Sequence, residues 1–137
     1  MTIDIVPRPD AGDKHALFLE FGPGRVDFRG VSQTLMLAPG PYRIKGIFKG
    51  ELTGVRGLQW KIRCAGAPEA ALGEGPMALG SQPTWADFEF AFTVPATECQ
   101  AQELRLEHAA RSASEQLLSG TIWYDEFELV RTDIANK

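Results

Sequence analysis

The run Leu58-Gln59-Trp60-Lys61-Ile62-Arg63-Cys64 decides the fold, because apolar and polar side chains alternate in it without a break. A period of two places Trp60 and Ile62 on one side of an extended chain and Lys61 on the other. Such a pattern is typical of a strand with one face against a core and the other face in water. We therefore predict a half-buried β-strand over residues 58–64.

The same alternation recurs along most of the chain, and turn signals such as Ala38-Pro39-Gly40-Pro41 separate the runs. The other predicted strands span residues 16–21, 26–28, 33–37, 42–48, 87–94, 103–107 and 121–130. About eight strands of this kind predict an all-β fold, an antiparallel two-sheet jelly-roll β-sandwich that forms one domain over residues 1–137. By parity, Trp60 and Trp123 are expected to pack in the core.

Three stretches lack the alternation. Residues 1–14 are polar and are expected to be a lead-in to the domain with no requirement for order. Residues 65–84 show no clear period, although 76–79 are a candidate short strand. Residues 109–118 favour a hairpin loop at 111–115 over a helical turn, in which Glu107 and Arg111 would pair.

Composition excludes several classes of protein. A chain of 137 residues with 44% hydrophobic residues suffices for one domain with a full core. Its net charge of −4 disfavours nucleic acid and anionic membrane surfaces as partners. No apolar run is long enough to span a bilayer, so we expect no membrane insertion by this domain. The polar N-terminal segment resembles neither a signal peptide nor a transit peptide. It is typical of a sequence that begins within a longer chain.

The sequence motifs of common enzyme classes are missing, which favours a protein that is not an enzyme. There is no nucleophile elbow, Walker loop, zinc-protease motif or dinucleotide fingerprint. Glu89 and Glu107 are interpreted as solvated charges rather than a glycosidase pair. His108 shares the parity of its apolar neighbours and is interpreted as a residue of the core or of a strand end. No catalytic residue is therefore predicted.

The polar side of the strands is the candidate binding surface. Planar donors and acceptors on rigid strands suit sugar hydroxyls, and a flat ring suits the apolar face of a sugar. The predicted carbohydrate-binding residues are Trp85, Tyr124, Gln59, Arg63 and Arg105. The alternative is an ordinary solvated face with cross-strand charge pairs.

Two further features concern stability. Cys64 and Cys99 either form a disulfide or are two reduced, buried thiols, and two Cys with two His cannot make a zinc cluster. Asp125 interrupts the apolar parity of the last strand, and Glu20 lies on the first. Together with backbone carbonyls these carboxylates are a candidate site for a structural calcium ion, whereas a hydrogen bond from Asp125 to nearby amides is the simpler interpretation.

Three segments resemble carbohydrate-binding modules of families 4 and 9. They are Gln33–Ile44 with its Pro-Gly-Pro-Tyr, the strand from Trp85 through Phe88, Phe90 and Phe92 to Val94-Pro95, and the closing strand Gly120–Leu129. The resemblance implies a galactose-binding-like jelly roll, and it maps a structural calcium aspartate onto Asp125. Segments 56–64 and 94–106 also resemble the C-terminal domain of some proteobacterial tetratricopeptide-repeat proteins. That resemblance favours the Cys64–Cys99 disulfide and a periplasmic or envelope location.

Two hypotheses about function follow. The first is a non-catalytic glycan-binding module that takes a glycan or exopolysaccharide and belongs to a larger envelope or repeat protein. The second is a structural or protein-interaction sandwich that docks on a partner, such as a repeat domain of the same protein, without binding sugar. It predicts an exposed apolar patch.

Overall fold

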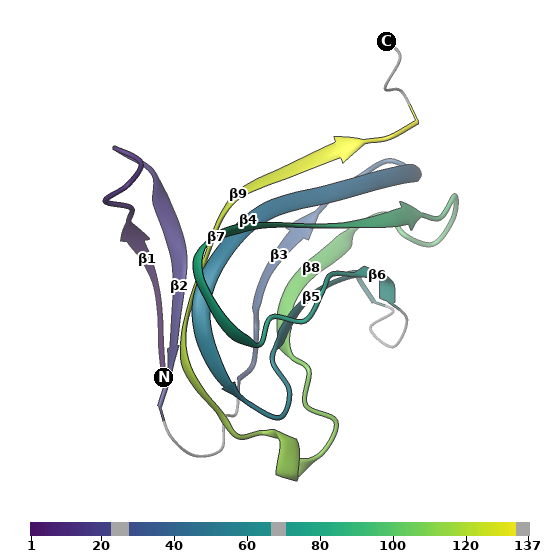
Figure 1. Cartoon of the computed structure of the whole chain (residues 1–137). Coiled ribbons are helices and arrows are strands. Elements are labelled where there is room, and N and C mark those ends of the chain that lie inside the picture. Colours follow the sequence, from purple (N-terminus) through teal and green to yellow (C-terminus); the bar gives the residue numbers. More distant parts are fainter. Residues whose placement is uncertain (23–27, 67–70, 134–137) are drawn as a thin grey trace.

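The protein is a two-layered β-sandwich (Figure 1) in a computed structural model that describes residues 1–22, 28–66 and 71–133. The elements are β1 Thr2–Pro7, β2 His15–Phe21, β3 Val31–Leu35, β4 Gly40–Gly54, β5 Leu58–Cys64, β6 Ala71–Glu74, β7 Gly80–Val94, β8 Gln102–His108, the short 3-10 helix η1 Ala113–Glu115 and β9 Leu118–Arg131. The predicted all-β jelly-roll sandwich is confirmed. Among the described residues, no helix is long and apolar enough to cross a membrane.

The strands form two antiparallel sheets. The order is β1-β2-β9-β4-β7 in the five-stranded sheet and β3-β8-β5-β6 in the four-stranded sheet. The alternation of β5 is confirmed, because Leu58, Trp60, Ile62 and Cys64 are buried while the residues between them are not. Their partners in the core include fully buried Leu19, Leu106 and Ile122. Apolar residues of both sheets therefore meet in one core.

A β-bulge in β9 reverses the direction of its side chains. Lys45 pairs with Glu128 and Ile47 with Asp125, so β9 has one residue more than β4 in this interval, and Glu126 has a φ of 55°. Before the bulge the even-numbered residues face the core, and after it the odd-numbered ones do. The prediction for Trp123 and Tyr124 was therefore wrong. Tyr124 is buried in the core, and Trp123 lies on the outer side against Phe18.

Other local predictions also need correction. Residues 2–7 of the expected lead-in form strand β1, which pairs along its whole length with β2. Within 65–84, residues 71–74 form β6 and β7 already begins at Gly80, while the expected position 76–79 has only an isolated bridge from Leu58 to Ala78. The 111–115 region contains η1, and Arg111 pairs with Glu115 rather than with Glu107. The expected strand at 26–28 lies mostly outside the described residues.

A disulfide joins Cys64 at the end of β5 to Cys99 in the loop before β8, with the two Cα atoms 5.1 Å apart. Both cysteines are buried at one edge of the core. The side-chain amide of the fully buried Gln102 donates to the Cys99 carbonyl, and its oxygen accepts from the Leu37 amide. The crosslink and this amide together hold the 95–101 loop against the four-stranded sheet.

Removing the crosslink should destabilise the domain without changing its fold. The bond spans 35 residues, and the chain-entropy model gives a stabilisation of about 3–4 kcal/mol for a loop of this length. We expect the Cys64→Ala/Cys99→Ala variant to lose about that free energy of unfolding in a urea titration. The parent protein measured in reductant should match the variant. An unchanged midpoint in both samples would contradict a closed disulfide.

Candidate ligand-binding groove

An apolar groove of about 380 Å³ opens between the two sheets. Strands of the five-stranded sheet supply one wall, and strands of the four-stranded sheet supply the other. The lining residues are Ile5, Leu17, Val31, Ser32, Gln33, Leu35, Ile44, Trp60, Leu104, Phe127, Glu128 and Leu129. A concave, mostly apolar site of this size with a few polar groups is the usual form of a small-ligand site.

Phe127 is the most prominent aromatic ring of the groove. It is 43% exposed, yet it packs edge-on against Trp60 at 5.1 Å and against Phe88 at 5.8 Å between ring centroids. The bulge at Glu126 is what turns Phe127 and Leu129 into the groove. The ring is therefore held rigidly from one side and is open to a ligand on the other.

Strand β1 extends the apolar wall. Its register pairs Ile3 with Leu19 and Ile5 with Leu17, so these side chains share the core face of the sheet. Ile3 is nevertheless 45% exposed and Ile5 61% exposed. The overhang of β1 therefore leaves apolar side chains uncovered beside the groove.

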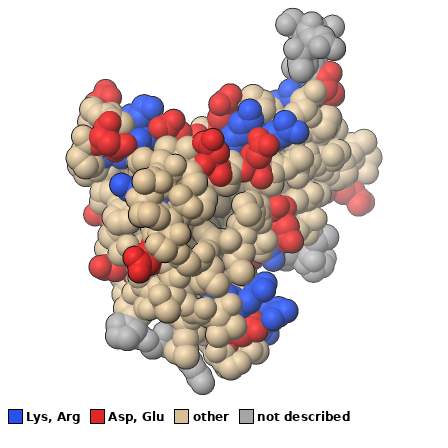
Figure 2. Space-filling model, viewed as in Figure 1, with Lys and Arg blue, Asp and Glu red and all other residues tan. Residues whose placement is uncertain are grey.

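Polar groups are few and lie mostly at the rim. Ser32, Gln33 and Glu128 are exposed, and Glu128 is the one charged residue among the described residues that line the groove, although its position in β9 places its side chain on the outer side, opposite Lys45. Trp60 is buried, and its indole Nε1–H has no hydrogen-bond partner in the described part of the chain. Figure 2 shows charged side chains gathered along the margin of the five-stranded sheet, above a hollow bordered mainly by uncharged atoms.

Three of the predicted sugar-binding residues share the outer face of the four-stranded sheet. Gln59 donates to the Gly75 carbonyl, and Arg63 forms a two-bond ion pair with Glu107 at 2.5 and 3.1 Å. Arg105 lies opposite Lys61 and donates to the Arg29 carbonyl. This face thus has the cross-strand ion pairs of the alternative interpretation, beside a shallow hollow lined partly by Arg105.

The other two predicted residues lie elsewhere. Trp85 is on the outer face of the five-stranded sheet, and Tyr124 is 3% exposed within the core, where burial raises its pKa. The structure therefore does not bring Trp85 and Tyr124 to Gln59, Arg63 and Arg105. The prediction of Tyr124 as an exposed platform is wrong, because the interruption of parity at Asp125 was not interpreted as a bulge.

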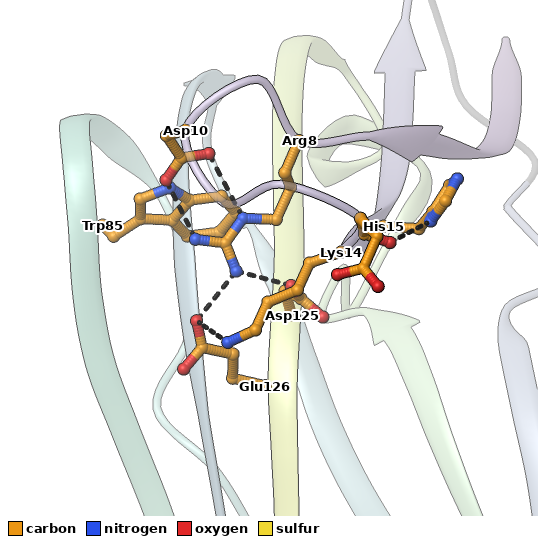
Figure 3. Close-up of polar contacts among 8 residues, drawn as sticks. Arg8, Asp10, Lys14, His15, Trp85, Asp125 and Glu126 are labelled. Atoms are coloured by element: carbon orange, nitrogen blue, oxygen red, sulfur yellow. Dashed lines mark hydrogen bonds and ion pairs between the residues drawn. The ribbon is translucent and has the colours of Figure 1, made fainter.

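Trp85 belongs to a cluster around a buried arginine (Figure 3). The Arg8 guanidinium is stacked 4.5 Å from the centre of the Trp85 ring and donates twice to Asp10, at 2.9 and 3.3 Å. Its Nη1 also donates to Asp125 at 2.6 Å and to Glu126 at 2.8 Å. Arg8 therefore fastens the β1–β2 loop to the bulge of β9.

The predicted calcium site does not fit this arrangement. A guanidinium already binds the Asp125 carboxylate, and Glu20 is paired in register with Thr121, four residues away along β9. Among the described residues, no group of three or more acidic, histidine or cysteine side chains is placed to hold a metal ion. Asp125 thus binds a cation that the chain itself supplies.

We expect neither calcium nor a chelator to alter the stability of the protein. Calcium would have to displace Arg8 from Asp125, at the cost of breaking a bonded ion pair. The measurement is the Tm in excess calcium and in excess EDTA at constant ionic strength. A rise of several degrees in calcium alone would contradict this prediction and restore Asp125 as a metal ligand.

Loss of Arg8 should weaken the protein mainly above pH 4. Hydrogen bonding to Arg8 lowers the pKa of Asp10 from near 4 to about 2 and also lowers the pKa of Glu126. A carboxylate with a depressed pKa stabilises the fold above its unfolded value and loses that effect as pH falls through the folded value. We expect Arg8→Met to lower Tm by about 5 °C at pH 7 and by less at pH 2.

The control for Arg8→Met is Arg43→Met, which removes an exposed arginine of β4. The two variants have the same net charge, so a general charge effect would affect both equally. A decrease in Tm that is equal for the two variants, or independent of pH, would contradict the role given to Arg8.

No protein-family model matches the sequence, and no curated protein matches it. Solved structures do match the fold. A family 4 carbohydrate-binding module superposes with a TM-score of 0.64 at 15% identity, covering 95% of this chain and 86% of its own. The fold is that of carbohydrate-binding modules.

Two other structures agree with this assignment of the fold. A second module from family 16 gives a TM-score of 0.60 at 16% identity, over 94% of this chain and 85% of its own. An arabinose-bound α-L-arabinofuranosidase gives 0.63 at 12% identity, where this chain matches in 99% of its length but covers 23% of the enzyme. At these identities the likeness describes the fold and leaves the ligand open.

Proposed function

We propose that this protein is a non-catalytic glycan-binding module and that the groove at Phe127 is its binding site. The observation that supports this most is a rigidly backed, half-exposed aromatic ring in an open groove of a carbohydrate-binding-module fold. A flat ring can stack on the C–H face of a sugar. Gln33 and Ser32 at the rim offer hydrogen bonds to hydroxyl groups.

The composition of the groove also supports binding without hydrolysis. Glycoside hydrolysis needs two carboxyl groups on either side of the scissile bond. Glu128 is the sole carboxylate among the described lining residues, and Glu89 is on the outer side of β7. One carboxylate can accept hydrogen bonds from a sugar, but it cannot supply both an acid and a base.

Phe127→Ala should remove glycan binding, because it deletes the stacking surface. We expect at least a tenfold weaker Kd in calorimetric titration against a panel of soluble polysaccharides. The matched control is Phe18→Ala, which removes a half-buried phenylalanine that packs on Trp123 on the outer side of the sheet. Equal loss in the two variants would indicate destabilisation, and unchanged binding in Phe127→Ala would exclude the groove.

The outer face of the four-stranded sheet is the second candidate location on the same protein. Gln59, Arg63 and Arg105 lie there, and a hollow is lined by Arg105, Glu107 and His108. Binding that survives Phe127→Ala but fails in Arg105→Ala would assign the site to this face.

A second candidate function is protein docking, favoured by the exposed apolar side chains of Ile3, Ile5 and Leu129 beside the groove. In that case the module would rest on a neighbouring domain, such as a repeat domain of a longer protein. The disulfide supports an oxidising compartment, in agreement with an envelope location. Docking would be favoured if no glycan of the panel bound and if a partner protein bound the module in a manner that depends on Ile5.

A further inference from the structure

Gln33 faces the inside of the groove from the four-stranded sheet. The register of β3 pairs it with Leu104, which packs against the core. It therefore shares the inner side of β3 with Val31 and Leu35, two other lining residues. Gln33 is exposed, and its side-chain amide has no hydrogen bond to another described residue. An amide both donates and accepts, so it can bind two neighbouring hydroxyl groups at once.

The other polar residues of the lining belong to the outer sides of their strands. Ser32 is paired with Arg105 on the outer face of the four-stranded sheet. Glu128 is paired with Lys45 on the outer side of the five-stranded sheet. The indole nitrogen of Trp60 is buried beneath the surface of the groove. A ligand inside the groove therefore meets a single polar side chain among the described residues, and that group is an amide.

The wall opposite Gln33 comes from the five-stranded sheet, and its described side chains that face inward are all apolar. They are Ile5, Leu17, Ile44, Phe127 and Leu129. A hydroxyl group pressed against such residues loses its hydrogen bonds to water and gains none in return. The groove is therefore polar on one side only.

An ordinary hexose does not match a groove of this kind along all its edges. Its neighbouring ring hydroxyls lie along one edge, and its exocyclic hydroxymethyl group projects from another. When two ring hydroxyls bind Gln33, the exocyclic group is directed toward the apolar wall. A hydroxymethyl group would bury an unpaired hydroxyl there, whereas a methyl group would gain apolar contact.

We infer that the groove binds a 6-deoxyhexose unit of a glycan, with two neighbouring ring hydroxyls on the Gln33 amide and the exocyclic methyl group against the apolar wall at Leu129. This inference rests on the proposed glycan-binding function. Phe127 stacks on the ring of the same sugar. The sugar is thus selected by the hydroxyl group that it lacks.

The test compares pairs of methyl glycosides that differ in a single hydroxyl group. One pair is L-rhamnose and L-mannose, and the other is L-fucose and L-galactose. NMR chemical-shift titration gives the Kd of each and suits the weak binding of single sugars. We expect at least one 6-deoxy sugar to bind about tenfold more tightly than its hydroxylated counterpart. Equal or weaker binding of the 6-deoxy sugar in both pairs would overturn the inference.

Leu129→Gln tests the apolar wall, because it places an amide where the methyl group should lie. Leu79→Gln is its matched control, since both leucines are 38% exposed and Leu79 lies outside the groove. The preference for the 6-deoxy sugar should fall several-fold in Leu129→Gln and persist in Leu79→Gln. A preference of the same size in both variants would overturn the assignment of the methyl group to this wall.

Gln33→Leu tests the polar side of the groove. It removes the amide that binds the ring hydroxyls, so it should weaken binding of the preferred sugar by about tenfold. The control is Gln100→Leu, which removes an exposed glutamine outside the groove. Both glutamines are exposed, so we expect both variants to fold. Equal affinity of the two variants would overturn the role given to Gln33.

The remaining outcomes separate this inference from the proposed function. Binding of neither pair overturns the 6-deoxyhexose inference, whatever other glycans bind. Glycan binding itself stands if another glycan binds in a manner that depends on Phe127, and it falls if no glycan binds at all.

Discussion

The bulge at Asp125–Glu126 is the constraint on which the rest of the structure depends. One extra residue in β9 turns Tyr124 inward and Asp125 outward, and then turns Phe127 into the groove. Without it, Tyr124 and Phe127 could not both face the core side, because residues three positions apart in a regular strand lie on opposite faces. A non-glycine residue at a φ of 55° is strained, so the surroundings must compensate. Arg8 supplies that compensation from the outer side by bonding both bulge carboxylates.

The groove and the arginine cluster thus lie on opposite faces of the five-stranded sheet at the same β-bulge. On the inner side the bulge gives Phe127 a backing of Trp60 and Phe88. On the outer side it gathers carboxylates around a guanidinium stacked on Trp85. Because Arg8 is part of the chain, its positive charge cannot dissociate as a bound ion can. The bulge at the groove is consequently held by a charge of the chain itself.

The sequence predicted the fold well and the site poorly, for identifiable reasons. Alternation in 58–64 and 87–94 indicates which face of each strand is buried. This depends only on the order of apolar and polar residues within the strand, so the sequence was enough to predict it. A bulge shifts parity by one residue, and its one trace in the alternation was Asp125, which was interpreted as a metal ligand or hydrogen-bonding residue instead, so Trp123 and Tyr124 were assigned to the wrong sides. A signal for β1 was present, since Ile3 and Ile5 alternate with Asp4. It was outweighed by the polar composition of residues 1–14. That Arg8 would meet Asp125, 117 residues away, depends on tertiary packing alone.

Ile3 and Ile5 are exposed on an edge strand, but the backbone of β1 disfavours pairing with another chain. An edge strand with apolar side chains invites pairing with another chain, which leads to aggregation. In β1, however, the Asp4 carboxylate accepts from the amide of Ile5, and Pro7 has no amide hydrogen to offer. The backbone of this edge is therefore a poor template for a new strand, while the side chains of Ile3 and Ile5 remain accessible from the core face. A ligand that contacts side chains across the groove fits this arrangement better than a peptide that extends the sheet.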